Sequence, residues 1–302
     1  SRMHPNAPQT GNHTRRIQNL VTIKSILDQG KPRFSFEYFP PKTEEGEAML
    51  FKTISEMGTL DPSFVSITCG AGGSTRDKTI DWAQTIKTEI GLEVMIHLTC
   101  LGLQKFEIRK SVQQIKDLGF ENVLALRGDG PPPTDPDVCH YASDLIEIIK
   151  DEYPAACLAA ACYPEVHTDA VSAAKDLDFL KAKVDLGVDV LITQLFFEND
   201  AFFKFVDQVR AAGIDVPIVP GIMPITNLQQ VQRFTDMCGA TIPSGLLQEL
   251  QECGDDKKAV KALGVAYAIQ QCRELIQNGV PGIHFYTLNK SPATRLVVKE
   301  LQ

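Results

Sequence analysis

The sequence predicts an α/β protein, a (β/α)8 TIM barrel with an extra N-terminal helix, and three observations support this prediction. Eight short apolar segments rich in β-branched residues recur along the chain, and segments with helical spacing separate them. Many helical segments end on a glycine just ahead of the next strand, as at Gly91, Gly119, Gly187 and Gly213. Gly119 follows Gly91 by 28 residues and Gly213 follows Gly187 by 26, which is the length of a βα unit.

Alternating helices and near-continuous apolar strands indicate a parallel sheet, and eight such units in roughly 250 residues favour a closed barrel over an open doubly wound sheet. An open dinucleotide-binding sheet would carry G-x-G-x-x-G after its first strand, whereas this first strand runs into Pro40 and Pro41. The stretch GAGGST (residues 70–75) has the wrong glycine spacing. We interpret it as a flexible loop after the second strand, with phosphate contact as the weaker alternative.

The remaining elements follow in order along the chain. A helix from about Ile17 to Leu27 precedes the first strand, and the stretch between the last two strands is long enough for two or three helices. No linker rich in Pro, Gly or Ser divides the chain, so residues 17–302 are expected to form a single catalytic barrel behind a flexible arm of residues 1–16. The eight expected strands are residues 34–39, 64–69, 94–99, 122–128, 157–163, 189–197, 217–222 and 282–288.

The composition argues against several classes of protein. The 302 residues are 43% hydrophobic and 23% charged, as in ordinary globular proteins, and the net charge of -8 argues against a nucleic-acid partner. No apolar run approaches the ~20 residues of a membrane span, so we expect no membrane partner and a cytoplasmic location. The eight cysteines include no C-x-x-C pair, and no strand-end cluster offers three metal ligands, so we expect reduced, mostly buried thiols and no metal site.

The segment FSFEYFPP (residues 34–41) places a carboxylate among aromatic rings in the first strand. Strand alternation puts Phe36 and Tyr38 on one face, and Glu37 and Phe39 on the other. We expect these rings to remove hydration from Glu37, which disfavours its anion and keeps a proton available near neutral pH. The alternative is a strand-end glutamate that faces water or forms an ion pair.

Polar side chains end seven of the eight expected strands, where a barrel builds its site. Such a ring indicates either a dense internal network or a large polar ligand, because buried polar groups must be paired. Taken singly, His97 could be a core histidine, Gln194 could cap a barrel layer, and Arg127 could pair internally with Asp129. The strand-end residues are Glu37, Thr68, His97, Arg127, Asp129, Tyr163, His167, Gln194, Tyr286, Asn289 and Lys290.

From about residue 33 to the C-terminus, the chain resembles the methylenetetrahydrofolate reductase family. The motifs that carry the resemblance are FSFEYFPPKTEEG, HLTC, ALRGD, YPEVH, LKAKVDLGVDVLITQLFF, PIVPGIMPI and PGIHFYTLNK. The resemblance implies a (β/α)8 barrel that binds FAD without a Rossmann domain, in agreement with the fold predicted from the strand pattern. Because the chain stops soon after TLNK, the resemblance indicates a bacterial-type enzyme or an isolated catalytic domain.

The resemblance also implies roles for individual residues. It implies that Glu37 is the general acid and that Asp129 is the carboxylate beside both the flavin and the folate pterin. Lys290 falls where many members have an arginine against the folate's glutamate tail, and a lysine supplies charge without the bidentate fork. The implied FAD contacts are Thr68, His97, Arg127, Gly128, Asp129, Tyr141, Ala142, Tyr163, His167, Asp176 and Lys183. The residues implied to bind folate or nicotinamide are Gln194, Gln230, Phe234, Tyr286 and Lys290.

The implied activity is the ping-pong reduction of methylenetetrahydrofolate to methyltetrahydrofolate, within one-carbon metabolism and methionine biosynthesis. In this scheme NADH or NADPH reduces FAD and leaves, and protonated methylenetetrahydrofolate opens to an iminium cation that accepts hydride from the reduced flavin. The choice between NADH and NADPH stays open, because no dinucleotide fingerprint is present. Family members commonly form homo-oligomers. Two rival interpretations stay open: a colourless non-redox lyase or pterin-binding transferase barrel, and a barrel that binds its ligand without turnover.

Overall fold

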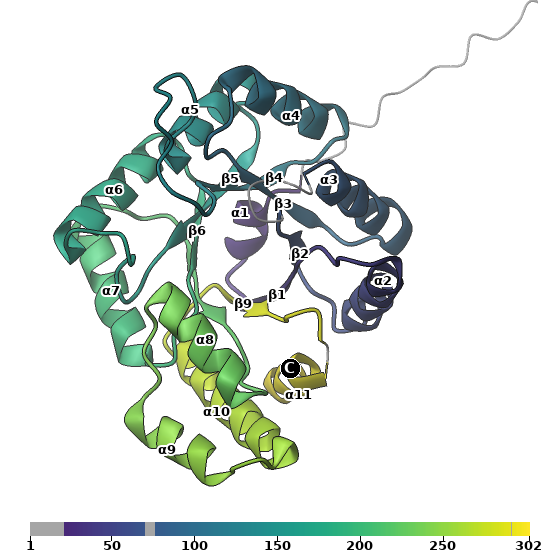
Figure 1. Ribbon diagram of the computed structural model, residues 1–302, viewed down its shortest axis with the longest axis vertical. Coiled ribbons are helices and arrows are strands. Elements are labelled where there is room, and N and C mark those ends of the chain that lie inside the picture. The colour runs from purple at the N-terminus through teal and green to yellow at the C-terminus, as the bar shows by residue number, and fades with distance from the viewer. Residues whose placement is uncertain (1–20, 70–75, 291) are drawn as a thin grey trace, which may run out of the picture.

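The computed structural model describes residues 21–69, 76–290 and 292–302, and its strands form a ring of parallel neighbours (Figure 1). The strand order is β7-β6-β5-β4-β3-β2-β1-β9-β8. Only Pro220 separates β7 from β8, so the two ends of this order meet in one segment and the barrel closes there, which confirms the predicted fold. The strands are β1 (Arg33–Tyr38), β2 (Phe64–Ile67), β3 (Val94–Thr99), β4 (Asn122–Leu126), β5 (Cys157–Cys162), β6 (Val190–Thr193), β7 (Ile218–Val219), β8 (Gly221–Ile222) and β9 (Gly282–Tyr286).

Six of the expected strands lie within two residues of the observed bounds, and two differ more. The expected strand 217–222 is split at Pro220, because proline has no N–H to donate to a neighbouring strand. Ile218 and Val219 pair with β6, whereas Gly221 and Ile222 pair with β9. The expected strand 189–197 ends at Thr193, and the apolar residues 195–197 are buried in side-chain clusters beyond the strand.

Helices cover the outside of the ring, and three of them separate β8 from β9, as predicted (Figure 1). Gly91 and Gly119 follow helical segments with φ of 80° and 76°, the left-handed conformation that favours glycine. A π-helical turn over Ile86–Ile90 extends α3. The helices are α1 (Ile23–Leu27), α2 (Glu44–Gly58), α3 (Arg76–Thr85), α4 (Lys105–Asp117), α5 (Ala142–Glu152), α6 (Ala173–Asp185), α7 (Asn199–Ala211), α8 (Leu228–Cys238), α9 (Ser244–Glu252), α10 (Lys257–Gln277) and α11 (Pro292–Leu301).

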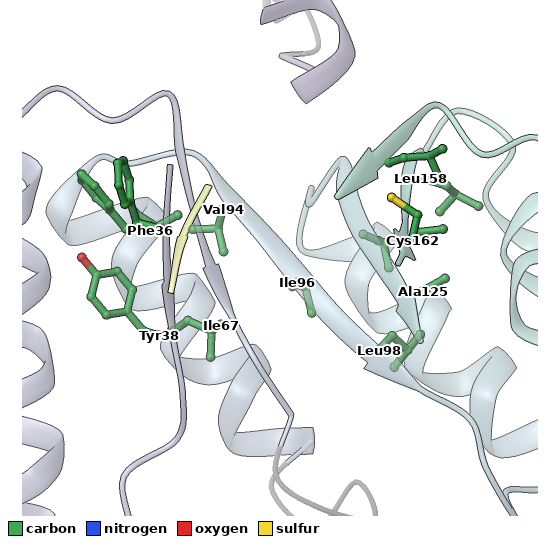
Figure 2. Packing of buried hydrophobic residues seen from close by; sticks show 14 of the residues in the cluster. Phe36, Tyr38, Ile67, Val94, Ile96, Leu98, Ala125, Leu158 and Cys162 are labelled. Atoms are coloured by element: carbon green, nitrogen blue, oxygen red, sulfur yellow. The ribbon is translucent and has the colours of Figure 1, made fainter. Parts of the chain in front are cut away.

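The barrel has an apolar outer face and an interior with an apolar lower layer. On the outer face, Phe36 and Tyr38 from β1 are fully buried in the cluster that packs against the helices (Figure 2). In the lower interior, Ile23 and Leu27 of α1 pack against Phe64 and other inward-facing side chains of the strands. The short helix therefore closes the floor of the barrel, at the end where the strands begin.

The N-terminal helix is shorter than predicted. Thr22 is its N-cap, with the side chain accepting a hydrogen bond from the Ser25 amide at 3.2 Å. Asn122, buried at the start of β4, accepts the Ile23 amide at 2.8 Å and donates to the Val21 carbonyl at 3.1 Å. These bonds hold the residues before the helix in place. The predicted arm of residues 1–16 and the glycine-rich loop of residues 70–75 lie outside the described residues.

Replacing Asn122 with Ala is expected to lower the free energy of unfolding by about 1–3 kcal/mol, because the buried Ile23 amide loses its acceptor. Urea unfolding followed by circular dichroism measures this loss. Asn278→Ala, which removes an exposed bond at the end of α10, is the matched control and should change stability by less than about 0.5 kcal/mol. Equal effects of the two substitutions would show that Asn122 does not anchor the floor.

Candidate active site

Glu37 lies on the inner face of β1, and polar side chains from neighbouring strands surround its carboxylate. Its Oε2 atom lies 3.2 Å from His284 Nε2 on β9 and 3.4 Å from His97 Nε2 on β3. The Ser66 hydroxyl of β2 donates to the same oxygen at 3.4 Å. The Glu37 side chain is 19% exposed, and Oε1 makes no hydrogen bond within the described part of the chain. One carboxylate oxygen is thus fixed inside the barrel, and the other is available to a ligand.

The expected effect of aromatic rings on Glu37 is wrong. Phe36 and Tyr38 project from the opposite face of β1, and Phe39 lies beyond the strand with 43% of its surface exposed. Burial raises the pKa of Glu37, but His97 and hydrogen bonds from His284 and Ser66 outweigh burial and lower that pKa below its ordinary value. In this environment Glu37 is therefore a carboxylate at neutral pH.

His97 is a buried, neutral histidine beside this carboxylate. Its side chain is 3% exposed, and burial lowers its pKa to about 4, although Glu37 acts in the opposite direction. Its Nε2 atom is buried and has no hydrogen-bond partner within residues 21–69, 76–290 and 292–302. Buried polar atoms are nearly always paired, and this nitrogen, 3.4 Å from Glu37 Oε2 without a hydrogen bond to it, is an exception to that rule.

Tyr286 crosses the barrel and contacts β6. Its hydroxyl donates to the Thr193 carbonyl at 2.5 Å, and the Thr193 hydroxyl accepts the Gly221 amide at 2.9 Å. A Cβ atom on Gly221 would lie 2.4 Å from the Thr193 carbonyl oxygen and 2.7 Å from the Tyr286 hydroxyl. Only glycine fits here, because its missing side chain leaves the space that the tyrosine hydroxyl occupies. Burial raises the pKa of Tyr286 far above its ordinary value, so its hydroxyl stays neutral.

The loop after β4 brings Arg127, Gly128 and Asp129 to the barrel mouth. Arg127 donates from Nε to the His140 carbonyl at 3.1 Å and from Nη2 to the Gly130 carbonyl at 3.3 Å. It forms no ion pair with Asp129 in the described ranges, so the interpretation as an internal pair is wrong. Gly128 has φ of 92°, which a side chain would strain, and Asp129 is exposed.

Two aromatic side chains follow β5 at the same mouth. The rings of Tyr163 and His167 meet edge to face, with centroids 4.4 Å apart. His167 Nδ1 accepts the Asp169 amide at 3.0 Å, so the ring proton lies on Nε2, which is left as a donor. Burial raises the pKa of Tyr163, and the nearby acidic groups of Cys162, Asp176 and Asp129 add to this effect.

Helix α6 adds Lys183, which lines the same cavity as Tyr163. Lys183 donates to the Ala161 carbonyl at 2.9 Å, and burial lowers its pKa although Cys162 and Asp176 act against this. The Asp176 carboxylate accepts the His167 amide at 3.0 Å and so fixes the loop after β5. Tyr163, Asp176 and Lys183 line a cavity of about 30 Å³.

Three predicted ligand residues lie at β6 and α8. The Gln194 side-chain oxygen accepts the Leu195 amide at 2.9 Å, which leaves the side-chain NH2 as a donor. Phe234 packs against the apolar cluster that Tyr286 also contacts, so these two lie on the same side of the barrel. Gln230, one turn earlier on α8, is partly buried.

The other predicted residues have fewer contacts. The Thr68 amide donates to the Tyr38 carbonyl at 3.0 Å and continues the pairing of β2 with β1. Tyr141 and Ala142 stand at the start of α5, with Tyr141 64% exposed. Lys290 is exposed, and its ammonium makes no hydrogen bond or ion pair within the described residues. The structure therefore brings Glu37 and His97 into direct contact but leaves Lys290 apart from them.

The sequence analysis missed His284, Ser35, Ser66 and Thr287, all of which contact Glu37 or its partner. The Thr287 hydroxyl donates to the Glu37 carbonyl at 2.7 Å. The signal that could have identified His284 is strand alternation, since His284 stands two residues before Tyr286 and shares its face. The pairing of Ser35 with His284 and of Glu37 with Tyr286 depends on the register between β1 and β9, which no local pattern contains.

The remaining chemistry of the described residues is limited. No group of three or more His, Cys, Asp or Glu side chains among them is arranged to hold a metal ion. Five of the eight cysteines are buried as thiols, as predicted. Within the described ranges, every helix is too short or too polar to cross a bilayer.

The fold and the site define a (β/α)8-barrel protein whose polar side chains gather at the carboxyl ends of the strands, as in barrel enzymes. The sequence profile described as methylenetetrahydrofolate reductase matches residues 22–302. The chain therefore belongs to the methylenetetrahydrofolate reductase family, and the resemblance found from its motifs is confirmed.

Named relatives agree with this assignment. The chain is 40% identical over 264 residues to the 5,10-methylenetetrahydrofolate reductase of Escherichia coli, an alignment that covers 87% of this chain and 88% of that protein. It is 41% identical over 282 residues to methylenetetrahydrofolate reductase (NADH) 1 of Arabidopsis thaliana, covering 88% of this chain and 48% of the plant protein. The chain thus spans about half the length of the plant relatives that it matches.

A solved structure shares the fold at low sequence identity. It is an uncharacterized protein from Clostridium thermocellum that binds two copies of 5-methyl-5,6,7,8-tetrahydrofolic acid. It matches with a TM-score of 0.64 and 19% identity, over 92% of this chain and 96% of that one. At this identity, the comparison supports the fold alone.

Proposed function

We propose that this protein reduces 5,10-methylenetetrahydrofolate to 5-methyltetrahydrofolate with a nicotinamide dinucleotide and bound FAD, and that Glu37 is the general acid. Membership of the family and the relatives named for this reaction support the proposal. The observation that carries it is the geometry of Glu37, whose Oε2 is held by His284 and Ser66 while Oε1 is left for a ligand. The plant relatives are named for NADH, so we propose NADH as the reductant.

The residues at the mouth suit FAD. The Nε2–H of His167 and the buried ammonium of Lys183 offer donors for a large polar ligand, and the unpaired Nε2 of His97 offers a further polar atom. The Arg127 guanidinium adds a permanent positive charge for phosphate or a ring carbonyl, and Tyr163 offers an aromatic edge. Thr68, Gly128, Asp129, Tyr141, Ala142 and Asp176 complete the proposed binding set. Bound FAD would supply hydride transfer between nucleotide and folate, for which the side chains here have no redox group.

The protein's own part is proton supply and charge stabilisation. A folate ring over Glu37 would exclude water from Oε1, and this desolvation would raise the pKa of Glu37 and favour its protonated form. Protonation of a folate nitrogen opens the five-membered ring to a cation, and the exposed Asp129 carboxylate would stabilise that positive charge as it develops. Gln194, Gln230, Phe234 and Tyr286 would bind the folate and the nicotinamide in turn. The cytoplasmic location and a homo-oligomeric state stay predictions.

The decisive experiment is the visible absorption spectrum of the purified protein. We expect a yellow protein that releases FAD on denaturation, identified by mass spectrometry, and that oxidises NADH when methylenetetrahydrofolate is supplied. A colourless protein that cannot be reconstituted with FAD would favour a non-redox barrel. A yellow protein that binds folate without turnover would favour the binding-subunit interpretation.

Lys290 is proposed to attract the folate's glutamate tail by charge alone. Lys290→Ala should raise the folate KM about two- to fivefold, the size expected for one exposed charge, and should leave NADH oxidation by an artificial acceptor within twofold. Steady-state kinetics with monoglutamyl and polyglutamyl folates measure the change. Lys299→Ala, an exposed lysine on α11, is the control and should leave both folate KM values unchanged. An unchanged KM in Lys290→Ala would remove this residue from the site.

A further inference from the structure

A continuous line of hydrogen bonds runs through the barrel interior from Ser35 to Glu37. The Ser35 hydroxyl lies 2.7 Å from His284 Nδ1, and His284 Nε2 lies 3.2 Å from Glu37 Oε2. Ser35 and Glu37 share the inner face of β1, and the register between β1 and β9 places His284 directly opposite Ser35. His284 therefore uses both ring nitrogens to connect a hydroxyl with the candidate general acid.

The His284 ring is held on both sides and has no access to solvent. Its side chain is 0% exposed. The Phe64 ring stacks on it with centroids 5.8 Å apart and an interplanar angle of 16°, and the Tyr286 ring meets it edge to face at 5.4 Å. Since the ring cannot turn without disturbing these neighbours, its two nitrogens keep their separate partners.

The pairing of Ser35 decides which nitrogen carries the proton. If the Ser35 hydroxyl donates to Nδ1, then Nε2 carries the proton and donates to the Glu37 carboxylate, and every donor has an acceptor. If Nδ1 donated to Ser35, the Ser35 hydrogen would have no acceptor in the described part of the chain, and Nε2 would place a lone pair against the Glu37 oxygen. The first arrangement is therefore the stable one.

We propose that Ser35 and His284 are positioning residues that act through Glu37: Ser35 fixes His284 as the Nε2–H tautomer, and that N–H binds Glu37 Oε2, so that the catalytic proton is carried on Oε1. The inference rests on the proposed role of Glu37 as general acid. Under this proposal, Oε2 of Glu37 accepts a hydrogen bond and Oε1 carries the proton. This difference depends on His284, which lies 247 positions from Glu37 in the sequence.

The proton transfer balances without a proton gained or lost by His284. The Oε1–H bond of Glu37 breaks, a folate N–H bond forms, and the electron pair stays on Glu37 as a carboxylate that the His284 N–H stabilises. Water at the mouth then returns a proton to Oε1. The titratable groups that face His284 and Glu37 are His97 on β3, which is neutral at pH 7, and Tyr286 on β9, whose hydroxyl is bound to Thr193.

The first test uses NMR on the purified protein and needs no turnover. With ¹⁵N-labelled histidine, the neutral form of His284 should appear as the Nε2–H tautomer, and Ser35→Ala should introduce the Nδ1–H tautomer. With ¹³C-labelled glutamate, assigned through Glu37→Gln, the Glu37 titration should move up by about one pH unit in Ser35→Ala, because its carboxylate loses a fixed donor. Ser111→Ala, which removes another buried serine bond on α4, should change neither signal.

The second test uses a matched pair of amides at position 284. A glutamine amide reaches about as far as Nε2 and an asparagine amide about as far as Nδ1, so His284→Gln should restore most of the donor to Glu37 and His284→Asn should not. We expect methylenetetrahydrofolate turnover to fall at least tenfold in His284→Asn and less than threefold in His284→Gln. NADH oxidation by an artificial acceptor should stay within threefold in both. The descending limb of the pH profile for folate turnover should move upward in His284→Asn alone.

The outcomes separate this inference from the proposed function. An Nδ1–H tautomer in the unmodified protein, or an unshifted Glu37 titration in Ser35→Ala, overturns the inference even if the enzyme reduces methylenetetrahydrofolate. Equal slowing of both activities in His284→Gln and His284→Asn, without a pH shift, also overturns it and leaves a purely structural histidine. If turnover is absent but the NMR results hold, the hydrogen-bond arrangement stands and the proposed reaction fails.

Discussion

Replacing Glu37 with Gln is expected to lower turnover of methylenetetrahydrofolate by ~10² or more while NADH oxidation by an artificial acceptor stays within about tenfold. Glutamine keeps the shape of the side chain and can still meet the Ser66 hydroxyl, but it has no carboxylic proton to give. Proton supply is needed only for the folate, because hydride leaves nicotinamide without a general acid. Rapid-mixing kinetics with each substrate alone measure the two effects.

Ser66→Ala is the matched control for this prediction, since it removes one long contact of 3.4 Å to Glu37 Oε2 and leaves the carboxyl group in place. It should slow folate turnover by less than tenfold. If Glu37→Gln slowed both substrates equally, Glu37 would be a structural residue at the mouth. If it slowed neither, the proton would come from elsewhere.

Replacing Gly221 with Ala is expected to destabilise the barrel by about 3 kcal/mol, at the upper end of the range for overpacked cores, and to abolish most folate turnover. The new methyl group would meet the Thr193 carbonyl and the Tyr286 hydroxyl, neither of which can move freely, because one is backbone and the other crosses the barrel. The substitution should therefore strain β8 and also displace Tyr286, a predicted substrate-binding residue. Thermal and urea unfolding, with kinetics on the folded fraction, measure both parts.

Two variants separate these parts. Gly245→Ala on α9, where an added Cβ meets nothing within 4 Å, should leave stability unchanged or raise it by up to about 1 kcal/mol. Tyr286→Phe keeps the ring and removes only the hydroxyl, so it should retain most stability while the bond to Thr193 is lost. If Gly221→Ala were as stable as the unmodified protein, Thr193 and Tyr286 would be able to move away from the added methyl group without a loss of stability.

Much of the fold was predictable because it repeats. Strand β3 matches its predicted bounds at Val94–Thr99, since an apolar run beside a helix stop such as Gly91 is a local signal. Pro220 was visible in the sequence, but the split that it causes was not. The split depends on the pairing of residues before Pro220 with β6 and of residues after it with β9, which only the closed ring establishes. The N-terminal helix was predicted too long, because its first bonds are made to Asn122, 99 residues further along the chain.

The candidate site was predictable as a set of positions but not as chemistry. The alternation of the first strand was predicted correctly, with Glu37 on the face opposite Phe36 and Tyr38, yet the expected neighbours of the carboxylate were the residues adjacent in sequence. The partners that set its ionisation, His284 and His97, come from other strands, so the predicted direction of its pKa shift was wrong. A single sequence shows which side chains face inward but does not show which of them meet.

The pairing of β1 with β9 has a consequence for the synthesis of the chain. The contacts of Glu37 with His284 and Thr287 join residues 247 and 250 positions apart, so Glu37 emerges from the ribosome long before its partners. Closing so long a loop is a slow and entropically costly step, and until then β1 presents an unpaired edge. A nascent chain that stops before Gly282 therefore lacks both the closed ring and the contacts of Glu37 with His284 and Thr287. A ribosome stalled there would display an exposed strand edge that a chaperone must cover until β9, Gly282–Tyr286, is made.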